Sequence, residues 1–316
     1  MAKKVQENLV KIPFDIMGRS KIWFVLSLFI IIPGIFCMFT KGFNFGIDFT
    51  GGTIMDLRFD NQVTLTQVRE VMKSYNLDNA TIQLSGEASN IEASADVMIR
   101  TADLEENERK EIMASLREQV GPYTVLREEK VGATIGGELI TDAVMATVLS
   151  WVLIVIYVSY RFEWRFGLSA ILALVHDILI VLSVFSFTQK QVDSSFVAAV
   201  LTIIGYSIND TIVIFDRIRE NMKLHYRKGG DLNELSNRSI YQTLTRSMYT
   251  VLTCLFTTFA LYFFGGDTTK DFAFALLIGF FSGCYSSIFI ASPMWVLLRN
   301  KFEVKHHTTK SDVQSA

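Results

Sequence analysis

Residues 194–215 read SSFVAAVLTIIGYSINDTIVIF, a run long and apolar enough to cross a lipid bilayer as one helix. Asn209 and Asp210 interrupt this run about two-thirds of the way along it. A charged side chain at the centre of a membrane costs at least about 2.5–3.5 kcal/mol on insertion scales, so such a residue has a function or a partner. The stretch therefore predicts a membrane helix that carries a functional or paired carboxylate.

The rest of the chain continues this pattern. It has 316 residues, of which 50% are hydrophobic, and a mean hydropathy of +0.32, which excludes an ordinary soluble protein of this length. Further apolar stretches that are long enough to span a membrane occupy residues 22–39, 139–160, 166–188, 247–264 and 272–298. We therefore expect six membrane helices, one polar domain at 40–138, and tails at 1–21 and 299–316.

The positive charges predict the orientation of these helices. The segments 1–21, 161–165, 216–246 and 299–316 would share one side of the membrane, and they hold 18 of the 30 Lys and Arg residues. Most of the others lie in the long 40–138 domain, which the positive-inside rule discounts. No small-residue cleavage site follows the first apolar run, so we expect that run to stay as a helix. Both termini are therefore predicted to be cytoplasmic, with the large domain outside.

The 40–138 domain alternates between the periods of strands and helices. Residues 51–59, 80–85, 95–101 and 123–131 alternate like strands, whereas 64–76 and 103–121 have the spacing of amphipathic helices, the first with Thr64 as a candidate N-cap. The resulting order is β-α-β-β-α-β. This order predicts a small α+β domain of the ferredoxin-like type.

The motif FNFGIDFTGGT at 43–53 connects the first apolar run to this domain. Gly46, Gly51 and Gly52 allow positive φ and a close approach of the backbone. Asp48 is able to cap a turn with its carboxylate. A tight entry into the first strand accounts for all four residues, so we interpret the motif as structural and not as catalytic.

Two polar stripes in the apolar runs carry the candidate site. Asn209 and Asp210 lie on the only polar face of the 194–215 helix, and Arg246 begins a stripe that continues through Thr250 and Thr253 on the next helix. Arg246 and Asp210 are predicted to lie at compatible depths, so they are able to pair. Such a pair is either a switch for proton or ion coupling or a purely structural ion pair, and the residues alone leave both interpretations open.

Two further features lie within predicted helices. His176 and Asp177 interrupt the 166–188 stretch, where they serve either as a polar relay or as hydrogen-bonded packing residues. The same two roles are open to Thr250 and Thr253. Gly279 and Gly283 form a GxxxG pair in the 272–298 stretch, which favours close contact with another helix.

The sequence contains no signature of an enzyme or of a resident cofactor. His176 and Asp177 suggest an intramembrane hydrolase, but HExxH and a second aspartate motif are missing. No zinc motif and no P-loop are present, so we expect neither a metal nor bound ATP. Any work that the protein performs would draw on an ion gradient or on the ATPase activity of a partner.

Three motifs together resemble the SecF members of the SecD/SecF family of bacterial protein-export membrane proteins. These are FNFGIDFTGGT after the first helix, SINDTIVIFDRIREN in the fourth and TLTRSMYTVLTCL at the start of the fifth. Six spans and one large loop after the first span agree with this family, so the resemblance covers nearly the whole chain. The family is similar to half of an RND-superfamily transporter, and SecD supplies the other half.

The resemblance implies a function that composition does not. The chain would be an auxiliary subunit of the Sec translocase in the bacterial inner membrane, partnered by SecD and YajC and associated with the SecYEG channel. It would promote late steps of preprotein translocation, after SecA has acted, and release on the periplasmic side, at the expense of the proton-motive force. Asp210 matches the carboxylate implicated in proton conduction, Arg246 matches the family's functional arginine, and Asn209 is the polar neighbour.

Two other functions remain open at this point. A self-sufficient RND-type exporter of ions or drugs would have to form a homodimer, because one chain supplies only half of the helices. A passive scaffold for the translocation channel would use Asp210 and Arg246 only as a structural pair.

Overall fold

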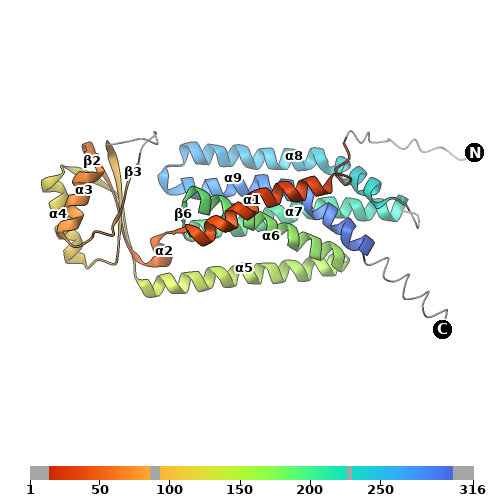
Figure 1. Cartoon of the computed structure of the whole chain (residues 1–316), viewed down its shortest axis with the longest axis horizontal. Coiled ribbons are helices and arrows are strands. Elements are labelled where there is room, and N and C mark those ends of the chain that lie inside the picture. Colours follow the sequence, from red (N-terminus) through yellow and green to blue (C-terminus); the bar gives the residue numbers. More distant parts are fainter. Residues whose placement is uncertain (1–13, 86–92, 226–229, 302–316) are drawn as a thin grey trace, which may run out of the picture. The chain divides into compact units, whose positions relative to one another are not determined.

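The computed structural model describes residues 14–85, 93–225 and 230–301, and the chain divides into two compact units (Figure 1). The first unit comprises the residues up to Asn44 and those from Ala146 onward, and it is helical. The second unit, Phe45–Met145, contains a four-stranded sheet and two helices that pack on it. Helix α5 begins in the second unit and ends in the first.

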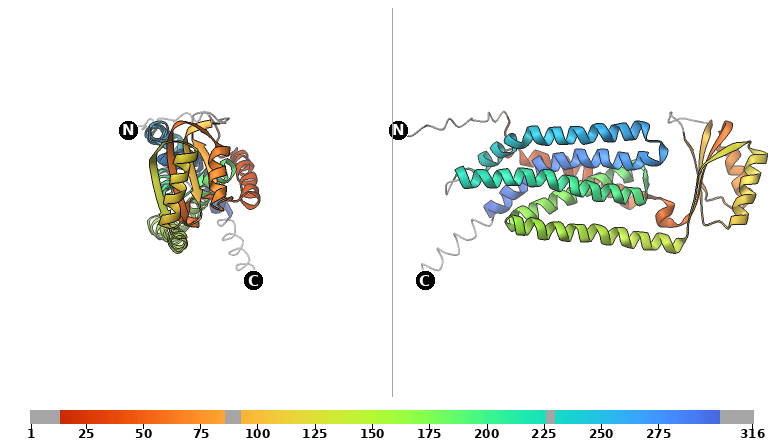
Figure 2. Two further views of the ribbon diagram at one scale, coloured as in Figure 1. Left: turned by 90° about the vertical axis from the view of Figure 1, so that its left-hand side faces the viewer. Right: turned by 180° about the vertical axis from the view of Figure 1, so that it is seen from behind.

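Long helices make up the first unit (Figures 1 and 2). They are α1 (Ser20–Thr40), α5 (Ala133–Arg161), α6 (Trp164–Thr188), α7 (Ser194–His225), α8 (Leu232–Phe264) and α9 (Asp267–Ser286). After α9, one turn of π-helix, η1 (Ser287–Ala291), leads into a helix that runs to Lys301. Within the described ranges, six helices are long and apolar enough to cross a membrane.

Helices α7 and α8 both extend into the segment 216–246, which lies between the apolar runs of two predicted membrane helices. Helix α7 continues to His225, and α8 begins at Leu232, where the Asp231 carboxylate accepts a hydrogen bond of 2.8 Å from the Asn233 N–H. An apolar run marks only the part of a helix that matches the hydrocarbon layer. A helix itself continues into polar sequence until a breaker or a cap ends it.

Close packing joins the helices of this unit. At Gly34 of α1, an added Cβ would lie 2.1 Å from the Ser183 side chain of α6, so the two helices cross where only glycine fits. Near one end of the bundle, the rings of Phe166 and Trp295 stack with centroids 4.7 Å apart, and both side chains are fully buried. Helices α6, α7 and α9 form the interior of the bundle, whereas α5 exposes most of its apolar surface.

The second unit follows the β-α-β-β-α-β order that the sequence predicts. Its main elements are β2 (Gly52–Thr64), α3 (Leu65–Ser74), β3 (Thr81–Ser85), β4 (Ala93–Thr101), α4 (Glu106–Gln119) and β5 (Tyr123–Val131). The strands form an antiparallel sheet in the order β3-β4-β2-β5. Two-residue strands β1 (Asn44–Phe45) and β6 (Gln191–Val192) lie outside this sheet.

Helices α3 and α4 cover the same face of the sheet and close one core with it (Figures 1 and 2). Alternate residues of β2, including Met55, Leu57 and Phe59, point into this core. As predicted, Thr64 caps α3, because its hydroxyl accepts a hydrogen bond from the Gln67 N–H in a capping box.

The glycine motif forms a single helical turn, α2 (Ile47–Thr50), followed by the start of β2. Gly51 and Gly52 have φ of +70° and +129°, as predicted, and a Cβ on Gly52 would lie 2.3 Å from the Thr101 carbonyl oxygen. Gly46 has an ordinary φ of −71° and takes the N-cap position of α2, so it does not use the positive φ that a glycine allows. Asp48 lies in the first turn of α2.

Candidate functional site

Asp210 is held inside the helix bundle by a neighbour that the sequence analysis did not identify. Its side chain lies on α7 and is only 7% exposed. The Ser247 hydroxyl of α8 donates a hydrogen bond of 2.6 Å to Asp210 Oδ1. Among the described residues, no hydrogen bond reaches the other oxygen, Oδ2, although it is also buried. A buried oxygen without a donor is costly for an ionised carboxylate, so the two oxygens of Asp210 lie in unequal surroundings.

Arg246 does not make the predicted contact with Asp210. Across the described ranges, no ion pair within 4.0 Å joins the two side chains, and Arg246 is exposed. The reason is helical geometry, because consecutive residues point about 100° apart and Ser247 takes the direction toward α7. Asn209 is also exposed, beside Asp210 on α7.

Two polar stripes therefore lie on the outer surface of neighbouring helices. On α8, Arg246 is followed by Thr250 and Thr253, whose hydroxyls bond back to carbonyl oxygens of the preceding turn of α8. On α7, Asn209 continues a line of exposed residues that includes Thr202. A threonine hydroxyl that bonds to a carbonyl oxygen of its own helix makes the helix surface polar, but that hydrogen bond does not connect two helices.

A cavity of about 690 Å³ is lined by the C-terminal part of α7, by Arg246 and nearby residues in the first half of α8, and by Arg161 at the end of α5. Cationic and acidic groups line it together, namely Arg161, Asp216, Arg217, Arg219, Glu220, Lys223 and Arg246, with Val213, Gln242 and Thr243. Asp216 and Arg219 pair within it at 2.8 Å. Val213 lies one helical turn from Asp210, so this charged cavity ends close to the buried carboxylate.

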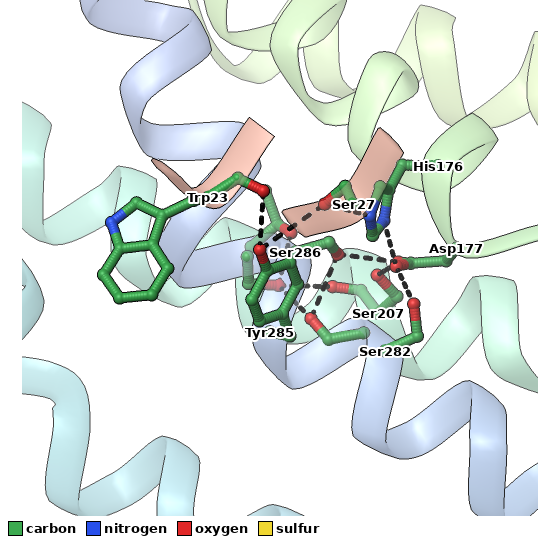
Figure 3. A network of polar contacts seen from close by, with 11 residues as sticks. Trp23, Ser27, His176, Asp177, Ser207, Ser282, Tyr285 and Ser286 are labelled. Atoms are coloured by element: carbon green, nitrogen blue, oxygen red, sulfur yellow. Dashed lines mark hydrogen bonds and ion pairs between the residues drawn. The ribbon is translucent and has the colours of Figure 1, made fainter. Parts of the chain in front are cut away.

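Asp177 is the centre of a second buried polar cluster, which Figure 3 shows. Its Oδ1 accepts a hydrogen bond of 2.7 Å from Ser282 and lies 3.1 Å from His176 Nδ1. Its Oδ2 accepts hydrogen bonds of 2.7 Å from both Ser207 and Ser286. Asp177 is 1% exposed. Each oxygen of Asp177 therefore accepts at least one hydrogen bond from a hydroxyl, in contrast to Asp210.

The cluster extends from Asp177 to α1 through His176. His176 Nε2 lies 2.9 Å from the Ser27 hydroxyl, and the Tyr285 hydroxyl next to Ser27 donates a hydrogen bond of 2.8 Å to the Trp23 carbonyl oxygen (Figure 3). The cluster thus joins four helices, α1, α6, α7 and α9. Both sequence interpretations of His176 and Asp177 expected hydrogen bonds, and the structure identifies the partners.

Ser27, His176 and Asp177 have the connectivity of a hydrolase triad, but their surroundings do not suit a nucleophile. Ser27 is 5% exposed and lies between His176 and Tyr285. The adjacent cavity of about 300 Å³ is walled mainly by apolar side chains. Acyl transfer requires an accessible nucleophile beside donors that stabilise an oxyanion, so we interpret the three residues as a hydrogen-bond chain.

The predicted GxxxG contact forms between α9 and α7. A Cβ on Gly279 would lie 2.2 Å from Ile203 Cδ1, and a Cβ on Gly283 would lie 3.0 Å from Ser207 Cβ. The prediction of close helix contact is therefore confirmed. One turn further, η1 begins at Ser287, whose hydroxyl lies 2.7 Å from that of Thr211. Single π-turns of this kind occur often at functional sites.

Sequence patterns gave only weak signals for the residues that complete these sites. Ser207, Ser247, Ser282 and Ser286 are small polar residues inside apolar runs, which is the available signal. Their partners depend on how the helices are rotated. Within the described ranges, no group of three or more His, Cys, Asp or Glu side chains is placed to hold a metal ion.

Comparisons with known proteins agree with these features. Residues 111–301 match the model of the family described as protein export membrane protein SecD/SecF, C-terminal, and residues 38–63 match the SecD/SecF GG motif. The protein translocase subunit SecF of Acidaminococcus fermentans is 48% identical over 290 residues, which cover 92% of this chain and 99% of that protein. The SecF subunit of Haemophilus influenzae is 39% identical over 90% of this chain and 86% of its own length.

Two solved structures are also similar. The crystal structure of SecDF, a translocon-associated membrane protein from Thermus thermophilus, superposes with a TM-score of 0.82 at 38% identity. That match covers 91% of this chain but only 39% of the SecDF chain. A structure of SecDF in a super-membrane-facing form gives a TM-score of 0.68 at 37% identity, over 94% of this chain and 40% of that one.

Proposed function

This chain belongs to the SecD/SecF family of protein-export membrane proteins, and we propose that it acts with a SecD subunit as an auxiliary part of the Sec translocase. In this function the complex uses the proton-motive force to promote late translocation steps and release of the preprotein on the periplasmic side. YajC, the SecYEG channel and, indirectly, SecA belong to the same proposal.

The proposed location is the bacterial inner membrane, with both termini in the cytoplasm. The distribution of Lys and Arg supports this orientation, because the charged cavity near Arg161 and Arg219 belongs to the positively charged side. The β-α-β-β-α-β unit is then a periplasmic, ferredoxin-like domain, where an extended preprotein is accessible to it.

The exposed polar stripes support a SecD partner. Asn209 lies on the outer surface of α7 within an apolar run, where lipid would leave its amide poorly solvated. A second bundle of helices that covers α7 and α8 removes this cost. The chain covers only 39% of the similar SecDF chain, which therefore contains sequence enough for such a bundle.

The observation that carries the proposal is the asymmetric environment of Asp210. One oxygen accepts a hydrogen bond from Ser247, the other is buried without a donor, and a charged cavity ends about one helical turn away. A carboxyl group in this environment is able to exchange a proton with the cavity, and loss or gain of its charge changes the contact between α7 and α8. Arg246 lines the same cavity and supplies a fixed positive charge there.

The available energy suits a conformational switch. Moving one charge across the membrane is worth about 2.3 kcal/mol per 100 mV, and each pH unit adds about 1.4 kcal/mol. One proton therefore supplies a few kcal/mol, which is the scale on which two conformations of a protein are interconverted.

Reconstituted vesicles test this function. They would hold the chain with SecD, YajC and SecYEG, and SecA would drive a preprotein in the presence or absence of a proton gradient. We expect the gradient to accelerate release with the wild-type chain, and Asp210→Asn to remove only that acceleration. Glu234→Gln, at an exposed position in the first turn of α8, is the matched control and keeps the acceleration. Equal responses of wild type and Asp210→Asn would make Asp210 a structural residue and place the proton coupling elsewhere in the complex.

A further inference from the structure

Helix α7 is held on two sides by two buried carboxylates. Its Ser207 donates a hydrogen bond to Asp177 of α6, and its Asp210, three residues later, accepts one from Ser247 of α8. Residues three apart on an α-helix point about 60° away from each other. One rotation of α7 about its axis therefore sets both contacts.

We propose that Asp177 is a positioning residue for Asp210: it fixes the rotation of α7 so that the Asp210 carboxyl faces Ser247. This inference rests on the proposed function insofar as Asp210 is the proton-coupling group. The rotation of α7 itself can be measured independently of proton transport.

The hydrogen bonds of Asp177 suit a residue that holds α7 in one rotation. Its two oxygens accept hydrogen bonds from Ser207, Ser282 and Ser286, Oδ1 also lies 3.1 Å from His176 Nδ1, and the carboxylate is 1% exposed. A buried carboxylate that is hydrogen-bonded on both oxygens holds its partners rigidly, because a lost bond leaves a buried charge without compensation. His176 in turn contacts Ser27 of α1, so Asp177 is anchored to helices on both sides.

Because α7 packs closely on α9, α7 cannot rotate about its axis and still keep the hydrogen bond from Ser207 to Asp177. A Cβ on Gly283 would lie 3.0 Å from Ser207 Cβ, so the backbones are nearly in contact at that level. The hydroxyls of Thr211 and Ser287, 2.7 Å apart, join the same two helices one turn further. To turn Asp210 away from α8, α7 must therefore break the bond between Ser207 and Asp177.

Two serines provide a matched pair of variants. Ser207→Ala and Ser282→Ala each remove one hydrogen bond of 2.7 Å to the same carboxylate, but only Ser207 lies on the helix that carries Asp210. A general loss of stability would follow from both changes. A loss of α7 positioning follows from Ser207→Ala alone.

The rate at which a disulfide forms between α7 and α8 measures whether α7 has kept its rotation. Asp210→Cys and Ser247→Cys replace side chains whose oxygens lie 2.6 Å apart, in a background in which the native Cys37, Cys254 and Cys284 are replaced. Oxidation would be followed in membranes that contain the complex with SecD, so that only inserted chains are scored. We expect Ser207→Ala to lower the rate of disulfide formation about fivefold, which corresponds to the loss of one ordinary hydrogen bond. We expect Ser282→Ala to leave it within about twofold.

Equal effects of the two serine variants would overturn the proposal, because Asp177 would then only stabilise the fold. No effect of either variant would also overturn it. If Ser207→Ala prevents assembly with SecD, Asp177→Asn takes its place. This variant keeps the shape of the side chain but replaces two acceptor positions by donors. It must lower the rate of disulfide formation to an extent similar to that expected for Ser207→Ala.

Preprotein release separates this inference from the proposed function. With native Asp210 and Ser247, Ser207→Ala should reduce the acceleration by a proton gradient more than Ser282→Ala does, while release without a gradient stays unchanged. If the disulfide responds as expected but the wild type shows no gradient effect, the positioning by Asp177 stands and the proposed function falls.

Discussion

Replacing Gly279 by alanine tests the packing that holds α9 against α7. The new Cβ would lie 2.2, 2.3 and 2.9 Å from three side-chain atoms of Ile203, whereas ordinary contact begins at 3.4 Å. Ile203 is 1% exposed, so its side chain cannot relieve these contacts by turning into solvent without leaving the core. Overpacking of this kind costs about 1–3 kcal/mol, and the better helix propensity of alanine returns at most about 1 kcal/mol. We expect Gly279→Ala to lower the free energy of unfolding by about 1–2 kcal/mol.

The assay is reversible unfolding of the purified chain in mixed detergent micelles, followed by circular dichroism. Gly205→Ala is the control, because a Cβ at this position of α7 meets nothing within 4 Å. Ile203→Ala removes the three clashing atoms, so the double variant Gly279→Ala/Ile203→Ala should be more stable than the sum of the single effects predicts, by about 1–3 kcal/mol. Additive effects, or equal destabilisation by Gly205→Ala, would refute the close contact.

Two further predictions concern residues outside the membrane-spanning segments. Thr64→Ala should remove the capping box of α3, and a loss of about 1 kcal/mol should raise amide hydrogen exchange in its first turn about fivefold, whereas Thr66→Ala, at an exposed position, should not. Hydrogen bonds from the Gly18 N–H and from Asn237 lower the pKa of Asp15 below its ordinary value of 3.8. The stabilisation by Asp15 is therefore complete above that value and is lost as the pH falls through the lowered pKa. Melting temperatures between about pH 6 and about pH 3 should fall less steeply for Asp15→Asn than for the wild type, and equal slopes would contradict the assignment.

The glycine motif and the second unit show what local sequence patterns predict. Apolar residues repeat every two positions in a strand and about every 3.6 positions in a helix, and both patterns depend only on residues that are close in the sequence. The β-α-β-β-α-β order and the cap at Thr64 can therefore be predicted from the sequence. The positive φ of Gly51 and Gly52 is likewise a local property of the backbone. Gly46 differs because a glycine also fits an N-cap with ordinary φ, and the sequence does not distinguish the two uses.

For the membrane helices, the sequence by itself determined that six apolar runs are present and that Asp177 and Asp210 lie inside them, because hydropathy is a property of each segment alone. Only the tertiary structure decided which groups meet these carboxylates. The partner of Asp210 is Ser247 rather than Arg246, and the serines around Asp177 lie 30, 105 and 109 residues away from it in the chain. The physical reason is that adjacent residues of a helix point about 100° apart, so the rotation of each helix in the packed bundle decides which of two neighbours meets the carboxylate.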